Sequence, residues 1–220
     1  ALGFAGLAMM ALQFALTARF KVLKSPYGAD MVYYFHRQIS LVAFGLILAH
    51  PIILFVFSPD TLQLLNIFTA PWRARAAVTA TLALILVIAL SVWRKRLRIN
   101  YTRWRIWHGI LATAAVALAL VHITLVGHYL DLPWKRVLWV GYGLFFLGML
   151  LWTRVIKPIQ LLARPYEVVD VTAERGETWT LALRPVGHRG FRFQPGQFAW
   201  ITARHSPFKD REHPFSFSSS

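Results

Sequence analysis

The chain has 220 residues, 57% of them hydrophobic, and a formal net charge of +15. Soluble domains are about 45–50% apolar, and here the apolar residues form long runs without charge, which argues against a soluble globular protein. The basic residues cluster between these runs, a pattern typical of membrane topology rather than of nucleic-acid binding. Cysteine is absent, which excludes disulfides and cysteine-ligated zinc or iron–sulfur sites from this chain.

Charge-free runs predict an all-α bundle of five membrane-spanning helices. The runs cover residues 1–18, 38–59, 76–93, 106–130 and 137–153. Each is about as long as a bilayer-spanning helix requires. The first run has neither the preceding basic residues nor the short apolar segment of a signal peptide. We therefore interpret it as a spanning helix of a chain that continues upstream.

Basic residues alternate between the two ends of the predicted helices. Twelve Lys and Arg side chains lie in segments 19–37, 94–105 and 154–157, against four at the other ends, namely Arg73, Arg75, Lys135 and Arg136. The positive-inside rule places the first three segments in the cytoplasm. Tryptophans at the predicted helix ends fit an interfacial belt in contact with membrane lipid (Trp72, Trp93, Trp134 and Trp152).

Two histidine pairs share one spacing. His36 and His50 are fourteen residues apart, as are His108 and His122, and all four lie in or beside apolar runs. On a helix, fourteen residues rotate the second side chain only about 40° from the first and raise it by about 21 Å. Each pair therefore faces one direction at two depths.

The predicted topology aligns the two pairs. Helices at 33–57 and 105–128 both run outward from the cytoplasm, so the inner histidines, and likewise the outer ones, lie at matching depths. Small residues between the ligand positions leave space for a flat macrocycle (Ser40, Ala43 and Ile47 on one helix, and Ala112, Ala115 and Ala119 on the other). We predict two haems, each clamped between one imidazole from each helix. A proton relay, a zinc site and plain interhelical polar contacts are the alternatives, and zinc is disfavoured because no carboxylate completes a tetrahedral site.

The character of the chain changes after Pro158, which predicts domains at 1–157 and 158–220. Runs rich in β-branched and aromatic residues predict strands at 166–171, 178–184 and 197–202. Turn residues punctuate them at Gly176, at 185–187 and at 195–196. We expect the beginning of a small antiparallel β-barrel on the cytoplasmic side.

Three features together resemble the bacterial branch of the NADPH oxidase and ferric reductase superfamily. The first is the pair of His-x13-His helices, with Arg37 and Pro51 directly after the first two histidines and Tyr101-Thr-Arg-Trp-Arg-Ile-Trp-His108 before the third. The second is Phe193-Gln-Pro-Gly-Gln-Phe198, which is similar to a strand and turn of ferredoxin-reductase-like flavin barrels. The third is His213-Pro-Phe-Ser216, which resembles the flavin-binding motif of the superfamily.

The resemblance implies a fold and a set of site residues. The superfamily core has six spanning helices, one more than this sequence shows, followed by an FAD-binding barrel. His36 and His108 would ligate an inner b-type haem, and His50 and His122 an outer one. The flavin would be lined by His213, Pro214, Phe215 and Ser216. Arg37 would pair with an inner haem propionate, or else be a topological charge. Phe44 is a candidate for the aromatic side chain that relatives place between the haems.

The resemblance also implies a function. Cytoplasmic NADPH, bound by a domain beyond residue 220, would reduce FAD, and electrons would cross the bacterial inner membrane through the two haems. The expected external acceptor is oxygen, which gives superoxide. The alternative is a ferric chelate, and a second alternative is a non-enzymatic haem subunit that relays electrons to a partner. The flavin motif counts against the last. The sequence leaves the oligomeric state open.

Overall fold

The computed structural model describes residues 1–18, 29–193, 196–203, 206, 208 and 212–218. It divides into two compact units, residues 1–149 and residues 150–220, which are treated separately below.

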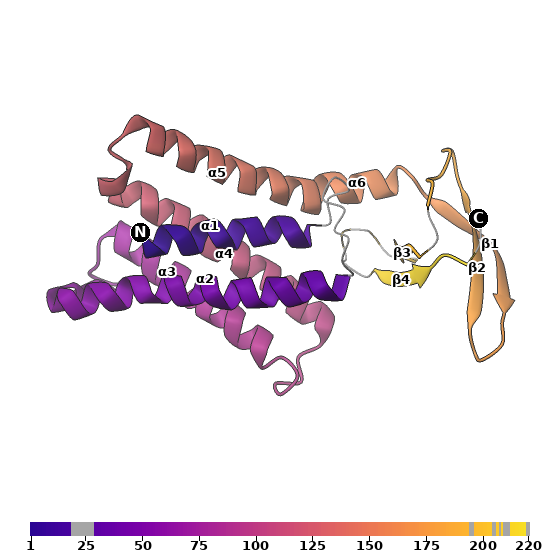
Figure 1. Cartoon of the computed structure of the whole chain (residues 1–220), viewed down its shortest axis with the longest axis horizontal. Coiled ribbons are helices and arrows are strands. Elements are labelled where there is room, and N and C mark those ends of the chain that lie inside the picture. Colours follow the sequence, from indigo (N-terminus) through magenta and orange to yellow (C-terminus); the bar gives the residue numbers. More distant parts are fainter. Residues whose placement is uncertain (19–28, 194–195, 204–205, 207, 209–211, 219–220) are drawn as a thin grey trace. The chain divides into compact units, whose positions relative to one another are not determined.

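The first unit is a bundle of antiparallel neighbouring helices. Its long helices are α1 (Leu2–Thr17), α2 (Ala29–Phe57), α3 (Trp72–Val92), α4 (Tyr101–Val126) and α5 (Pro133–Leu151), with short 3-10 turns η1 (Pro59–Leu65) and η2 (His128–Leu130). Within it, α1 packs along α2 and α3 packs along α4. Figure 1 shows α2 and α4 running in the same direction, which confirms the predicted parallel arrangement of the two histidine helices.

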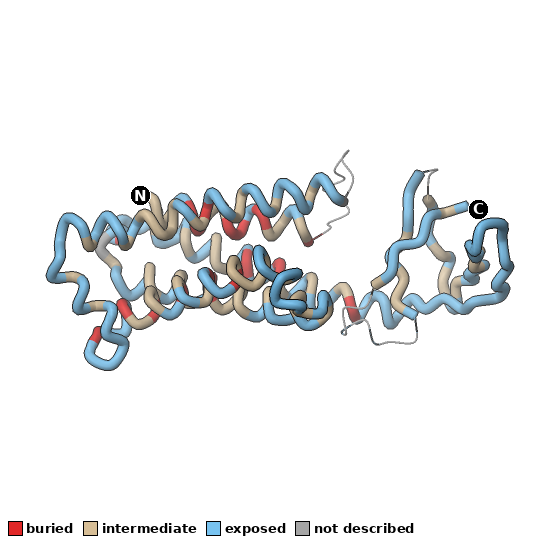
Figure 2. Tube along the Cα trace, turned by 90° about the horizontal axis from the view of Figure 1, so that it is seen from below, coloured by how far each residue is buried: buried red, intermediate tan, exposed pale blue. Residues whose placement is uncertain are grey.

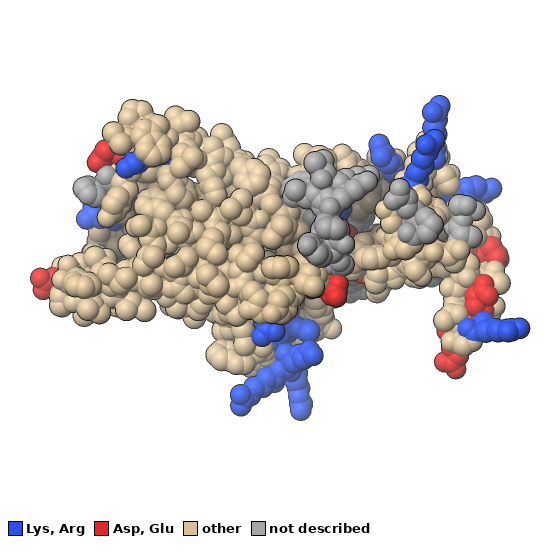
Figure 3. All heavy atoms as spheres, viewed as in Figure 1, with Lys and Arg blue, Asp and Glu red and all other residues tan. Residues whose placement is uncertain are grey.

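In the part of the chain that the structure describes, four helices are long and apolar enough to cross a membrane: 30–57, 72–92, 101–126 and 133–162. The prediction of five spans is therefore confirmed for four. The remaining helix, α1, has 16 residues and so measures about 24 Å, short of a hydrocarbon core of about 30 Å. Figure 3 shows the charged side chains gathered away from the middle of the bundle face in view.

Local signals explain where α4 begins and ends. The Asn100 side chain accepts a hydrogen bond of 2.8 Å from the Thr102 backbone N–H, and so caps the first turn. Gly127 ends the helix with a φ of +69°, a conformation that a residue with a Cβ rarely adopts. Between these caps, α4 presents His108 in its second turn and His122 near its last.

The interior of the bundle is built from small and flexible side chains. A buried cluster takes one residue from each of four helices, Met10, Ala43, Leu84 and Ala115. Figure 2 shows buried positions in short runs along the helices, with much of the tube exposed. In a lipid bilayer this exposed apolar surface faces hydrocarbon, so the composition and the burial agree with a membrane protein.

In the second unit, α5 continues through a π-helical stretch (η3, Trp152–Ile156) into α6 (Lys157–Leu162). Four strands follow: β1 (Tyr166–Ala173), β2 (Trp179–Pro185), β3 (Phe198–Ile201) and β4 (His213–Ser216). The first three match the predicted strands closely.

The expected barrel is not seen in the described residues. They form two separate antiparallel sheets, β1–β2 and β3–β4. Closing a barrel requires every strand to pair on both sides, and here each strand has one partner. The side chains of β1 are correspondingly exposed along its whole length.

Candidate functional site

The structure brings His36 of α2 and His108 of α4 together. Their ring centres are 6.2 Å apart, with an angle of 66° between the ring planes. A metal–imidazole bond is about 2.0–2.1 Å long and the nitrogen lies roughly 1.1 Å from the ring centre, so two imidazoles on opposite sides of one metal have ring centres about 6.3 Å apart. The observed separation therefore fits two axial ligands of one iron.

A serine on α3 holds the ring of His108. The Nδ1 atom of His108 lies 3.1 Å from the Ser91 hydroxyl oxygen. That oxygen also contacts the Val87 carbonyl at 2.6 Å and receives the Trp104 indole N–H at 3.3 Å. The indole of Trp104 lies against the imidazole, with ring centres 5.1 Å apart. This end of the bundle thus places a polar and an aromatic contact around one histidine.

The outer histidine of α4 is also held from α3. The Nδ1 atom of His122 lies 2.8 Å from the backbone carbonyl oxygen of Arg73. A carbonyl can only accept, so Nδ1 carries the proton and Nε2 carries the lone pair. A proton on Nδ1 bound to a carbonyl is the usual arrangement of a histidine that ligates a metal through Nε2.

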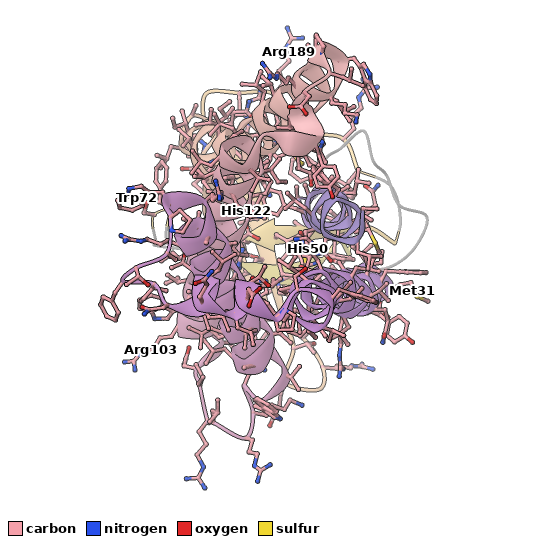
Figure 4. All side chains as sticks on the ribbon, turned by 90° about the vertical axis from the view of Figure 1, so that its left-hand side faces the viewer. Met31, His50, Trp72, Arg103, His122 and Arg189 are labelled. Atoms are coloured by element: carbon pink, nitrogen blue, oxygen red, sulfur yellow. The ribbon has the colours of Figure 1, made fainter. Side chains whose placement is uncertain are left out.

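His50 lies near the other end of α2 from His36 and packs against α1. A Cβ added to Gly3 would lie 3.4 Å from the imidazole Cδ2 of His50, so α1 passes within van der Waals reach of that ring. In the end-on view of Figure 4, His50 and His122 both lie toward the middle of the bundle. The two outer histidines thus come from the same two helices as the inner ones.

An apolar layer separates the two histidine levels. Ala43 and Ala115 belong to the buried cluster, and each is seven residues from both histidines of its own helix. Phe44 packs against the same cluster. Of the predicted small residues, Ala43 and Ala115 are therefore buried between the histidines and Ile47 packs against them, with an aromatic ring beside them.

The inner histidine of α2 has different surroundings from His108. Within the described part of the chain, its buried Nδ1 atom has no hydrogen-bond partner. One turn along α2, the Ser40 hydroxyl lies 2.7 Å from both the His36 carbonyl oxygen and Oε1 of Gln13, a buried polar residue of α1. These contacts fix the backbone of α2 near His36 and leave the ring itself less constrained.

The arrangement suits a two-ligand iron site better than a zinc site. Among the described residues, no three His, Asp or Glu side chains lie close enough together to hold a metal ion, whereas structural zinc takes four ligands. The two neighbouring imidazoles of His36 and His108 would instead hold a haem iron between them. Arg37 is exposed on α2, next to His36 in the sequence, and its pairing with a propionate stays a prediction.

Two of the outer basic residues have structural contacts. Arg75 donates to the carbonyl oxygens of Ala70 and Phe68, at 2.7 and 2.8 Å, and closes the turn before α3. Arg136 donates to the Leu130 carbonyl oxygen at 2.7 Å and ties the turn before α5. These two side chains therefore organise the outer loops.

The two sequence motifs that are predicted to bind flavin meet in one sheet. Strand β3, which contains the end of the Phe193–Phe198 motif, pairs with β4, which is the His213–Ser216 motif itself. Phe198 is opposite Ser216, and Ala199 is opposite Phe215. All four residues of β4 are exposed. Gln194 and Pro195 of the first motif lie outside the described residues.

Sequence reasoning missed the contacts that α3 makes to the histidines. Ser91 is a serine near the end of an apolar run, and the contribution of Arg73 is a backbone carbonyl that no side-chain pattern reveals. Gln13, a polar residue inside a charge-free run, could have signalled a different contact, the one between α1 and Ser40 of α2, because buried polar groups in membrane helices are costly and are usually partnered.

Comparison with known proteins agrees with this site. The family model for the ferric reductase like transmembrane component matches residues 2–121. The chain therefore belongs to this family of integral membrane oxidoreductases. It is also 29% identical over 135 residues, which is 58% of this chain and 73% of the relative, to an uncharacterised protein of Archaeoglobus fulgidus.

Proposed function

We propose that this protein carries electrons from cytoplasmic NADPH, through FAD and two b-type haems, to an acceptor outside the membrane. Membership of the ferric reductase-like family supports transmembrane electron transfer in general. The observation that carries the specific proposal is the pair of facing imidazoles, His36 and His108, at a ring separation of 6.2 Å.

The residues of the chain would hold and orient the haems. His36 and His108 would hold the inner haem, and His50 and His122 the outer haem. Helix α3 fixes the tautomer of His122 through the Arg73 carbonyl. The haems would supply one-electron redox chemistry when bound.

The second unit would receive the flavin. Phe215 would pack on the isoalloxazine and Ser216 would hydrogen-bond to it, because a hydroxyl can both donate and accept as the flavin changes protonation. The pairing of β3 with β4 supports this assignment, since it places both sequence motifs in one small sheet.

Two acceptors are compatible with this electron-transfer path. The first is oxygen, in which one NADPH and two O₂ give NADP⁺, two superoxide ions and one proton. The second is a ferric chelate, reduced to its ferrous form. The test is turnover of NADPH by the full-length protein in proteoliposomes, with superoxide and ferrous iron measured in parallel.

The controls test the identity of the acceptor separately from the electron path. Superoxide that disappears under argon, together with unchanged ferrous production, identifies a metal reductase. Superoxide that persists when the chelate is omitted identifies an oxidase. Oxidation of NADPH without either product, and without haem reduction, contradicts the proposed electron path.

A further inference from the structure

We propose that Ser91 of α3 is a positioning residue for the inner haem, acting through the imidazole of His108. It would hold the ring with Nδ1 protonated and Nε2 toward His36, and it would set how strongly that imidazole donates electrons. This inference rests on the proposed haem ligation, and the experiment below distinguishes its failure from a failure of that ligation.

Hydrogen-bond counting assigns the proton on His108. A serine hydroxyl has one hydrogen to donate and two lone pairs to accept with. Its shortest contact, 2.6 Å, is to the Val87 carbonyl, which can only accept, so the hydrogen lies there. The Trp104 indole N–H can only donate, and it uses one lone pair at 3.3 Å. The second lone pair is left for His108, which therefore donates from Nδ1 at 3.1 Å.

The consequence is a defined tautomer for His108. With its proton on Nδ1, the neutral imidazole carries its lone pair on Nε2, the nitrogen that a haem iron would take. The backbone of α3 anchors the arrangement, because Ser91 is tied to Val87 one turn earlier in the same helix. The Trp104 ring covers one side of the imidazole, with centres 5.1 Å apart. The ring of His108 is therefore held before any haem binds.

Helix α3 makes the contacts that fix both histidines of α4. Ser91 holds His108 at one end of α3, and the Arg73 carbonyl holds His122 at the other end. The outer contact uses the backbone and cannot be removed by substitution, whereas the inner contact uses a side chain and can. In the described residues the buried Nδ1 of His36 has no such acceptor. Ser91 is thus the side-chain contact through which the inner haem can be tuned.

The expected direction follows from the hydrogen bond. An acceptor on Nδ1–H makes the imidazole a better electron donor and so stabilises ferric iron. Replacing Ser91→Ala removes that acceptor. The ratio of ferrous to ferric iron in one haem, at a given applied potential, should then rise about threefold to tenfold. A tenfold gain corresponds to a midpoint potential about 59 mV higher. The other haem should keep its potential.

The experiment is a redox titration of the full-length protein, followed by optical and low-temperature EPR spectroscopy. Ser91→Thr is the rescue variant, because a helical threonine can keep both the bond to Val87 and the acceptor. Thr81→Val is the matched control, since Thr81 makes the same kind of bond to its own α3 backbone, to the Ala77 carbonyl at 2.9 Å.

Each outcome of the titration either supports or overturns the proposal. A raised potential for one haem in Ser91→Ala, or loss of that haem alone, with Ser91→Thr and Thr81→Val like the unmodified protein, supports the proposal. Two haems with unchanged potentials and unchanged EPR spectra in Ser91→Ala overturn it, as does an equal shift in Thr81→Val. Fewer than two haems in the unmodified protein would instead overturn the proposed function.

Discussion

Hydrogen bonds distinguish the histidines of α4 from those of α2. His108 and His122 both meet an acceptor on α3 through Nδ1. The buried Nδ1 of His36 meets none in the described part of the chain, and His50 lies against Gly3 of α1. Because a fixed ring loses less entropy on binding a metal, the α4 histidines should be the firmer ligands and the α2 histidines should adjust to them.

Replacement of His122→Leu should remove one haem of two. A single imidazole, His50, cannot supply both axial ligands at the outer level, whereas His36 and His108 remain 6.2 Å apart at the inner level. Pyridine haemochrome analysis should fall from about two haems per chain to about one. Retention of two haems, or loss of both from a folded protein, would contradict the assignment of ligands to levels.

Helix α1 packs closely against α2 beside His50, the outer histidine of α2. A Cβ on Gly6 would lie 2.6 Å from Cγ1 of Ile47 and 2.9 Å from the Ala43 carbonyl oxygen, so the helices touch through a glycine. Small residues at such positions let membrane helices approach closely. The next glycine toward the N-terminus of α1, Gly3, faces the ring of His50.

Gly6→Ala should therefore destabilise the bundle, although alanine favours helices. Overpacking costs about 1–3 kcal/mol, which outweighs a gain of about 1 kcal/mol in helix propensity. The matched control is Gly45→Ala on α2, where a Cβ would meet nothing within 4 Å. Unfolding in detergent, followed by helical circular dichroism and haem release, should show a lower midpoint for Gly6→Ala only. Equal midpoints for the two variants would refute close packing at Gly6.

Helices and strands could be predicted here to within a few residues, because each has a strong local signal. Apolar runs of bilayer length mark α2 to α5, and alternating β-branched residues mark β1 and β2. The run at 1–18 likewise matches α1, Leu2–Thr17, although that helix is shorter than the four spanning candidates. The barrel was not found because strand patterns predict strands but not how many partners each one has.

Of the candidate site, only the four histidines, which follow the helical repeat, could be predicted from the sequence. Fourteen-residue spacing on parallel helices was enough to bring His36 and His108 together. The contact between Ser91 and His108 depends on how α3 packs against α4, and the turn between these helices sets that register. Ser91 also resembles any membrane serine bonded to its own helix, as Thr79 and Thr81 are. Nothing in the sequence separates these three residues.

At the scale of the whole molecule, the proposed redox function calls for two differently built units. The helical unit is apolar and carries the four candidate haem ligands on two of its helices, whereas the second unit presents the His213–Ser216 motif on an exposed strand. Under the proposal, the flavin would meet a soluble hydride donor, and the haems would be insulated by lipid and protein.

Ser216→Ala should slow haem reduction by NADPH in the full-length protein without changing haem content. The hydroxyl would be the flavin contact that follows the protonation change, and its loss should cost about tenfold to a hundredfold, as a positioned hydrogen bond commonly does. The matched control is Ser218→Ala, which lies two residues on and beyond the end of β4. Stopped-flow absorbance of the haem measures both. Equal rates for the two variants would remove Ser216 from the flavin site.

The last prediction concerns the order of the two haems. If electrons pass from the inner haem to the outer one, losing an inner ligand and losing an outer ligand should interrupt different steps. With His122→Leu, the inner haem should still be reduced by NADPH through the flavin, but delivery to oxygen or to a ferric chelate should collapse. The two levels are about 21 Å apart along each helix, too far for useful transfer without the outer relay. With His108→Leu, reduction of the remaining haem should itself fail. Proteoliposomes of both variants, with haem absorbance and external product recorded together, separate these steps. Near-normal external product from His122→Leu would show that the acceptor is reached from the inner haem or the flavin, and the series arrangement would then be wrong.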